Sequence, residues 1–119
     1  MGEAKNSDAL DRHLDGKHAI VRAIYEHLIV TLKRFGPITE EPKKTSIHLV
    51  NRTAFAGVAT RKDFLILTIK SDRNRNSPRI HKTEQTSARR FHHEVKLKSP
   101  ADIDSELVSW LKSAYELSA

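Results

Sequence analysis

The spacing of apolar residues follows a helical period at both ends of the chain and a strand period in its middle. Over His18–Phe35 the apolar positions recur every three to four residues, which predicts an amphipathic helix. Gly36 and Pro37 end this helix, since glycine permits a left-handed cap and proline cannot continue a helix. A shorter helix is predicted over Ser7–Gly16, with Ser7 as its cap, and residues 1–6 are expected to form a disordered tail.

Between residues 38 and 97 the pattern changes to the two-residue alternation of β-strands. The clearest case is Phe91–Leu97, in which odd-numbered residues are apolar or histidine and even-numbered residues are polar. Phe64–Ile69 is apolar on both faces and is therefore expected at the centre of a sheet. Three further strands are expected, at Ile38–Glu41, Ser46–Val50 and Thr53–Ala59. Residues 70–90 are polar and lack a clear period, so a long loop is expected there, with a short strand at Arg79–Lys82 as an option.

The last helix has a start signal in Ser99–Asp102. Ser99 is expected as its cap, Pro100 suits the first helical position and Asp102 places an acid in the first turn. The expected buried stripe is Ile103, Leu107, Trp110, Leu111 and Ala114. Helices, then strands, then a helix predict an α+β fold. We expect an antiparallel sheet of about four to five strands, with two N-terminal helices and one C-terminal helix packed on one face and basic side chains on the other.

Length and composition limit the class of protein. A chain of 119 residues holds one domain, expected over residues 7–117. The chain has no cysteine, which removes disulfides and thiolate chemistry, and no apolar run suited to a membrane span or a secretory signal. These features indicate a cytoplasmic protein with no membrane partner, and they leave its oligomeric state open.

Positive charge is concentrated in the middle of the chain. The net charge is +6, and residues 43–98 hold 14 Lys and Arg against four Asp and Glu, which gives this segment +10 and the rest of the chain −4. A compact domain that keeps such a density of like charge often has an anionic partner. The alternative is that these side chains only keep the sheet soluble and protect its edges from pairing with other chains.

Several short stretches, taken in order, resemble one family over nearly the whole chain, residues 7–117. They are Asp-Arg-His-Leu-Asp-Gly-Lys (11–17), Lys-Thr-Ser-Ile (44–47), Phe-Ala-Gly-Val (55–58), Phe-His-His-Glu-Val-Lys-Leu (91–97), Ser-Pro-Ala-Asp-Ile-Asp (99–104) and Trp-Leu-Lys-Ser-Ala-Tyr (110–115). In these stretches the chain is similar to the family catalogued as domain of unknown function 5655. The resemblance implies a small domain that occurs alone or attached to larger proteins, some of them similar to nucleases, and it implies no established activity.

His93 is a candidate for a pocket residue. Its expected neighbours on one strand face are Phe91, Val95 and Leu97, so its imidazole should point into the core or toward a cavity rim. A buried histidine must find hydrogen-bond partners or lose its charge. One interpretation is a pocket residue that exchanges a proton. The other, which we favour, is a core histidine bonded to a backbone carbonyl.

Patterns for metal binding and catalysis are weak in this chain. His48, His81, His92 and His93 lack metal-ligand spacing, and the adjacent strand residues His92 and His93 point to opposite faces, so no metal or other cofactor is expected. The chain also lacks a phosphate-binding glycine loop and a nucleophile elbow. Catalysis by another arrangement stays open, although binding without catalysis is preferred.

The basic residues supply the main functional hypothesis. The candidate ligand-binding residues are Lys44, Arg52, Arg61, Arg79, Lys82, Arg89, Arg90 and His93. We expect a non-enzymatic binding module whose basic sheet face and 70–90 loop contact a nucleic acid backbone or a phosphorylated or other small anionic ligand. Base recognition is not expected, because Phe55, Phe64 and Phe91 are explained as core residues rather than as stacking platforms. Two alternatives stay open: a small-molecule pocket, with or without catalysis, lined by His93 and Lys44, and a protein-interaction or nuclease-accessory domain.

Overall fold

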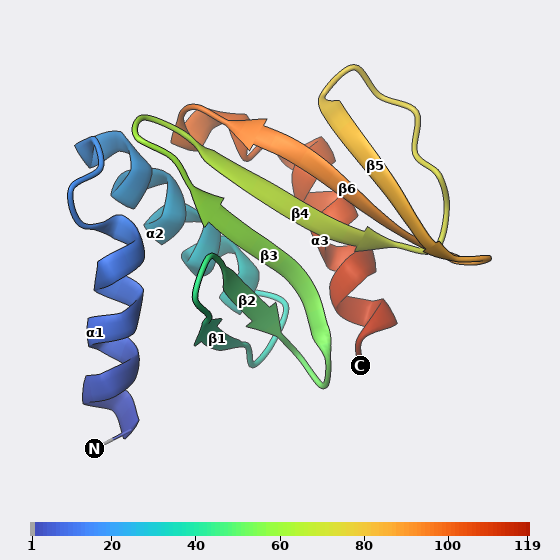
Figure 1. Ribbon diagram of the computed structural model, residues 1–119. Helices are drawn as coiled ribbons and strands as arrows, with labels where there is room; N and C mark the ends of the chain where they lie inside the picture. Colours follow the sequence, from blue (N-terminus) through green and yellow to red (C-terminus); the bar gives the residue numbers. More distant parts are fainter. Residues whose placement is uncertain (1) are drawn as a thin grey trace.

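The computed structural model describes residues 2–119 and confirms the α+β architecture (Figure 1). Two helices, α1 (Gly2–Leu14) and α2 (Ala19–Lys33), precede the sheet, and α3 (Ser105–Leu117) follows it after a 3₁₀ turn, η1 (Pro100–Asp102). The strands are β1 (Thr39–Pro42), β2 (Ile47–Val50), β3 (Ala54–Thr60), β4 (Leu65–Ser71), β5 (Ile80–Ser87) and β6 (Arg90–Leu97). They form one antiparallel sheet of six strands in the order β1-β2-β3-β4-β6-β5.

Helices cover one face of the sheet and leave the other face open. In Figure 1, α2 and α3 lie behind the sheet, and the open face points toward the viewer. Strand β4 shows the consequence, because Leu65, Leu67 and Ile69 are at most 2% exposed on the covered face while Thr68 and Lys70 on the open face are half-buried. β4 pairs with β3 and β6, as expected for its apolar sequence.

The helices bury the stripes that the sequence predicts and end where it predicts. In α3, Leu107, Trp110, Leu111 and Ala114 are buried. Helix α2 is capped by His18, whose Nδ1 accepts a hydrogen bond from the Ile20 N–H at 3.0 Å. Gly16 (φ 73°) lies between α1 and α2, and Gly36 (φ 147°) follows α2, so both glycines adopt backbone conformations that other residues rarely reach. Among residues 2–119, no helix combines the length and the apolar character needed to cross a bilayer.

Two helix starts differ from the prediction. α1 begins at Gly2 rather than at Ser7, because Glu3, Ala4 and Lys5 are good helix formers, so most of the segment expected as a tail belongs to this helix. Met1 lies outside the described residues, as do the side chains of residues 2–7. α3 begins at Ser105 and is capped by Asp104, whose Oδ1 accepts the Leu107 N–H at 3.0 Å. The Ser99–Asp102 signal instead forms the separate turn η1.

The expected loop at residues 70–90 is wrong for most of its length. β4 continues to Ser71 and β5 occupies Ile80–Ser87, so the loop between them covers only residues 72–79. β5 is an edge strand that is exposed at seven of its eight positions. A strand without a buried face has no reason to alternate, which is why its sequence shows no period. The 72–79 loop packs on the helix-covered side, where the Arg75 guanidinium lies 5.6 Å from the centre of the Trp110 ring, and it leaves the open face uncovered.

Candidate functional site

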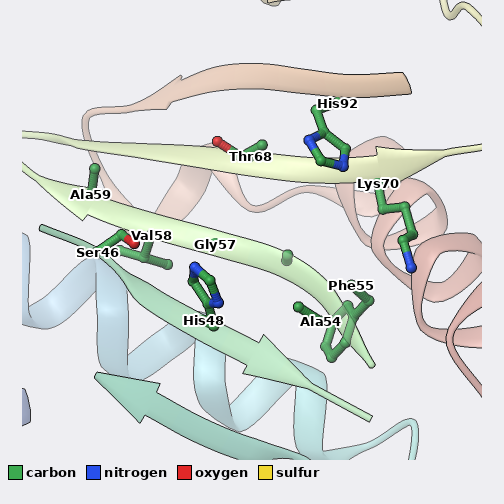
Figure 2. Close-up of a pocket in the computed structure, with 11 residues that line it drawn as sticks. Ser46, His48, Ala54, Phe55, Gly57, Val58, Ala59, Thr68, Lys70 and His92 are labelled. Carbon is green, nitrogen blue, oxygen red and sulfur yellow. The ribbon is translucent and has the colours of Figure 1, made fainter. Parts of the chain in front are cut away.

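Strand pairing brings three basic side chains together on the open face. His48 of β2 is opposite Gly57 of β3, which is opposite Thr68 of β4. Two residues further along β4, Lys70 is opposite His92 of β6. Because neighbouring strands lie about 4.8 Å apart, these positions form two adjacent rows across the middle of the sheet. Figure 2 shows His48 beside Gly57, with His92 and Lys70 further along the sheet and the Lys70 side chain bending toward Phe55 and Ala54.

A pocket of about 240 Å³ lies among these side chains. Its floor is the small-residue part of β3, with Ala54, Gly57 and Ala59 on the open face, and its walls are the larger side chains of the neighbouring strands. We call it the Gly57 pocket. The polar residues that line it are Ser46, His48, Thr68, Lys70 and His92.

Gly57 has no structural requirement to be glycine. Its φ is not among the positive values found in the described residues. A Cβ placed on Gly57 would meet only the Ile47 carbonyl oxygen, at 3.8 Å, which is ordinary van der Waals contact. Glycine inside a strand is less stable than alanine by roughly 0.5–1 kcal/mol. Glycine at position 57 therefore does not stabilise the local backbone. Its effect is that no side chain fills the pocket at this position.

Lys70 is an ammonium group without an acidic partner. Its Nζ donates to Ser118 Oγ at 3.0 Å and to Thr53 Oγ1 at 3.4 Å. Within residues 8–119, no carboxylate lies within ion-pair distance of this nitrogen. Burial of the ammonium, followed by repulsion from Arg90, lowers the pKa of Lys70 below its ordinary value. An anion beside Lys70 would oppose both effects.

The other polar groups of the pocket are also unused. In the part of the chain that the structure describes, the rings of His48 and His92 and the hydroxyls of Ser46 and Thr68 make no hydrogen bond to protein groups; the side-chain hydrogen bonds of that part are made elsewhere. All four groups reach solvent, since no buried polar atom of the described residues lacks a partner. They are available to a ligand.

Acidic residues border the pocket, but among residues 8–119 none of them forms an ion pair with Lys70, His48 or His92. Glu41 is opposite His48 on the β1 side, and Glu84 is opposite His92 on the β5 side. Glu94, opposite Thr68, directs its carboxylate toward β5, where Oε1 lies 3.2 Å from His81 Nε2 and Oε2 lies 3.9 Å from Lys82 Nζ. Over residues 8–119, no three potential ligand residues gather as a metal ion would need. The pocket is suited to an anion rather than to a metal ion.

The basic residues selected from the sequence are divided between the two ends of the sheet. Lys44 lies in the β1–β2 turn and Arg61 in the β3–β4 turn, at one end. Arg52 in the β2–β3 turn, with Arg89 and Arg90 at the β5–β6 turn, lies at the opposite end. The length of β3 separates the two ends by about 20 Å. Arg52, Arg89 and Arg90 therefore share an end with Lys70, whereas Lys44 and Arg61 do not.

Arg79 and Lys82 are engaged by carboxylates. Arg79 Nη1 lies 2.7 Å from Asp104 Oδ1 and 3.3 Å from Glu106 Oε1, and these acids raise the pKa of Arg79 against the effect of its burial. This arrangement ties the start of β5 to the N-terminus of α3. Lys82 Nζ makes a long contact, 3.9 Å, to Glu94 Oε2. Neither residue lines the Gly57 pocket.

His93 is a buried residue of the covered face, 1% exposed. Its Nδ1 lies 2.9 Å from Thr83 Oγ1. In one tautomer Nε2–H donates to the Arg73 carbonyl oxygen at 3.2 Å. In the other tautomer Nε2 accepts a hydrogen bond from the Arg75 N–H at 3.2 Å. The ring thus holds the 72–79 loop against β6. His93 is separated from Lys44 by at least three strand spacings, about 14 Å, so the two residues do not share a cavity.

His48, Thr68, Lys70 and His92 were not selected from the sequence as binding residues. The alternation of β2 and β6 did place His48 and His92 on polar strand faces, which was the available signal. Lys70 was assigned to a loop, so its face was not considered. Alternation predicts the face of a residue but not its neighbours on other strands, and the pocket depends on those neighbours.

Comparison with known proteins gives a family but no function. A family model described as "Domain of unknown function (DUF5655)" matches residues 10–118. No curated protein and no solved structure matches the chain.

Proposed function

This chain belongs to the DUF5655 family, whose description assigns no activity, and we propose from its geometry that it is a non-enzymatic module that binds an anionic partner on the open face of its sheet. The observation that supports this proposal is Lys70, a half-buried lysine that lines the Gly57 pocket with His48 and His92 and has no carboxylate within ion-pair distance among residues 8–119. A partly desolvated cation is stabilised by a hydrogen-bonded anion more than by neutral hydroxyls.

The distribution of charge beyond the pocket favours an extended anion. Arg52 and Arg89 are exposed and Arg90 is half-buried, all at the end of the sheet that Lys70 approaches. The net charge of +6 adds a general attraction for polyanions. A nucleic acid backbone could contact the Gly57 pocket and these arginines together, through phosphate contacts that do not depend on base sequence.

The aromatic residues of the sheet support backbone contact rather than base recognition. Phe55 is fully buried. Phe91 belongs to the covered face, where its ring stacks on His93 at a centroid distance of 6.3 Å. The ring of Phe64 is covered by Lys96, whose Nζ lies 4.7 Å from the ring centre. None of these three rings is presented for the base stacking that sequence-specific sheet binders use.

Fluorescence anisotropy with single-stranded DNA and RNA of random sequence tests the proposal. We expect binding at about 50 mM salt that weakens steeply toward about 200 mM salt. Lys70→Gln should weaken binding and reduce the slope of log K against log salt by about one. Lys112→Gln is the matched control, because Lys112 is exposed on α3 on the covered side of the sheet. Absence of binding at the lower salt concentration, or equal loss in both variants, would refute the proposal.

A further inference from the structure

The Gly57 pocket has the size and the donors for one anionic group. Its volume of about 240 Å³ lies below the roughly 300–1,000 Å³ of pockets that enclose whole small molecules. A single phosphate or carboxylate group fits this volume, while a nucleotide does not. The remainder of any ligand must therefore lie outside the pocket, over the open sheet.

The charge and donors of the pocket distinguish a phosphate monoester from other anions. A carboxylate or a phosphodiester carries one negative charge, whereas a phosphate monoester carries about −1.5 to −2 at neutral pH and three strong acceptor oxygens. Lys70 has three N–H donors, of which two are directed to Ser118 and Thr53. A third N–H of Lys70, one ring N–H each from His48 and His92, and the hydroxyl of Thr68 belong to side chains that line the pocket. This number of donors matches a terminal phosphate.

Gly57 gives an independent indication that the space is used. A strand glycine is less stable than alanine, its φ here is not positive, and a Cβ would make no close contact. The effect of a larger residue would be to fill the pocket between His48 and Thr68, its partners on the two neighbouring strands.

We infer that the Gly57 pocket is a subsite for a phosphate monoester, with Lys70, His48 and His92 as its ligands. This inference rests on the proposed anion-binding function and narrows it to a terminal phosphate. Two sources share this chemistry: the phosphorylated end of a nucleic acid strand and a free phosphorylated small molecule. An internal phosphodiester of a strand would contact the same lysine and the arginines at the sheet end, but with a single negative charge.

Three probes separate these possibilities: a single strand of about ten nucleotides with a 5′-phosphate, the same strand with a 5′-hydroxyl, and phenyl phosphate. Removal of a charge-assisted contact corresponds to about tenfold in affinity. We therefore expect the phosphorylated strand to bind at least about tenfold more tightly than the hydroxyl strand, and phenyl phosphate to compete for the difference.

Gly57→Val is the decisive variant. Valine suits a strand and fits the local backbone, so its melting temperature should equal or exceed that of the wild type, while its side chain occupies the phosphate position. Both strands should then bind Gly57→Val equally, at the wild-type affinity of the hydroxyl strand. Gly57→Ala is the matched control, with a smaller loss of the preference for the 5′-phosphate.

The possible results separate the inference from the function on which it rests. Equal binding of the two strands by the wild type would overturn the phosphate subsite and leave the polyanion function intact. Binding of phenyl phosphate without either strand would support the subsite, identify a small phosphorylated ligand and overturn the nucleic acid partner. A preference for the 5′-phosphate that persists in Gly57→Val would place the terminal phosphate elsewhere and overturn the inference.

Discussion

Replacement of His93 by alanine separates its structural role from a role in binding. The imidazole is 1% exposed, and it connects β6 to Thr83 of β5 and to the backbone of the 72–79 loop. It lies on the opposite face of the sheet from the Gly57 pocket. We therefore expect His93→Ala to reduce the stability of the fold and to leave anion binding unchanged.

The hydrogen bonds give the magnitude. A neutral imidazole makes two of the contacts at once: Nδ1–H to Thr83 with the Arg75 N–H donating to Nε2, or Nε2–H to the Arg73 carbonyl with Thr83 donating to Nδ1. Each bond contributes about 0.5–1.5 kcal/mol, and loss of the buried ring adds a packing term. The free energy of unfolding should fall by about 2–4 kcal/mol, which is a large part of the roughly 5–15 kcal/mol typical of a domain. Thr83→Val removes one of these hydrogen bonds and should reduce the free energy of unfolding by about 1 kcal/mol.

Urea denaturation measures the stability of both variants, and hydrogen exchange at the Arg75 amide reports on the loop directly. That amide should exchange faster in His93→Ala, because its acceptor is removed. Anisotropy with the DNA probe is measured below the denaturation midpoint. An unfolding free energy within about 0.5 kcal/mol of the wild type would refute the structural reasoning. A loss of DNA affinity at unchanged stability would instead make His93 a binding residue.

Three further predictions follow from charged groups. Asp104→Ala should lower the unfolding free energy by about 1 kcal/mol at pH 7, as measured by urea denaturation, because it removes the α3 cap. The cap hydrogen bond and Arg79 lower the pKa of Asp104 in the folded protein. The difference in unfolding free energy between wild type and variant should therefore shrink as the pH falls below the ordinary pKa of 3.8 and through the folded-state pKa. Lys70 has a lowered pKa, so anion affinity measured by anisotropy should begin to fall at a lower pH than 10.5, the ordinary lysine value, and Lys70→Gln should lack this fall. Replacement of both Arg89 and Arg90 by Glu should weaken DNA binding and reduce the slope of log K against log salt by about two. Lys44→Glu, at the opposite end of the sheet, should have little effect on DNA binding. A larger loss of affinity in Lys44→Glu than in the double variant would contradict the placement of the anion.

The sequence predicted those elements whose residues have one buried face. β4 and β6 lie close to their predicted limits, and the alternation of β6 correctly placed His93 on the buried side. α3 buries the predicted stripe, although it starts later than Ser99 indicated. β5 could not be found in this way, because a strand exposed on both faces has no apolar face to bury and leaves no mark in the order of polar and apolar residues.

The candidate site depended on information that alternation does not contain. The polar faces of β2 and β6 could be read from the sequence, but not that Gly57 lies between His48 and Thr68 or that Lys70 is opposite His92. That arrangement is set by strand order and register, which the turns and the buried residues fix together. A search for basic residues on polar strand faces, with a small residue on the strand between them, would have selected this pocket.

The topology also explains why a basic segment of sequence does not become one basic surface. Successive turns of an antiparallel sheet lie at alternate ends, so cations in consecutive turns, such as Lys44 and Arg52, are placed about 20 Å apart. Their number along the chain therefore says little about a binding site. Lys70 differs because it lies within a strand, where its neighbours are fixed and its ammonium is partly buried without an acid among the described residues. Replacement of Lys70 or Gly57 should therefore change the affinity for a phosphate more than an equal change in net charge elsewhere on the chain.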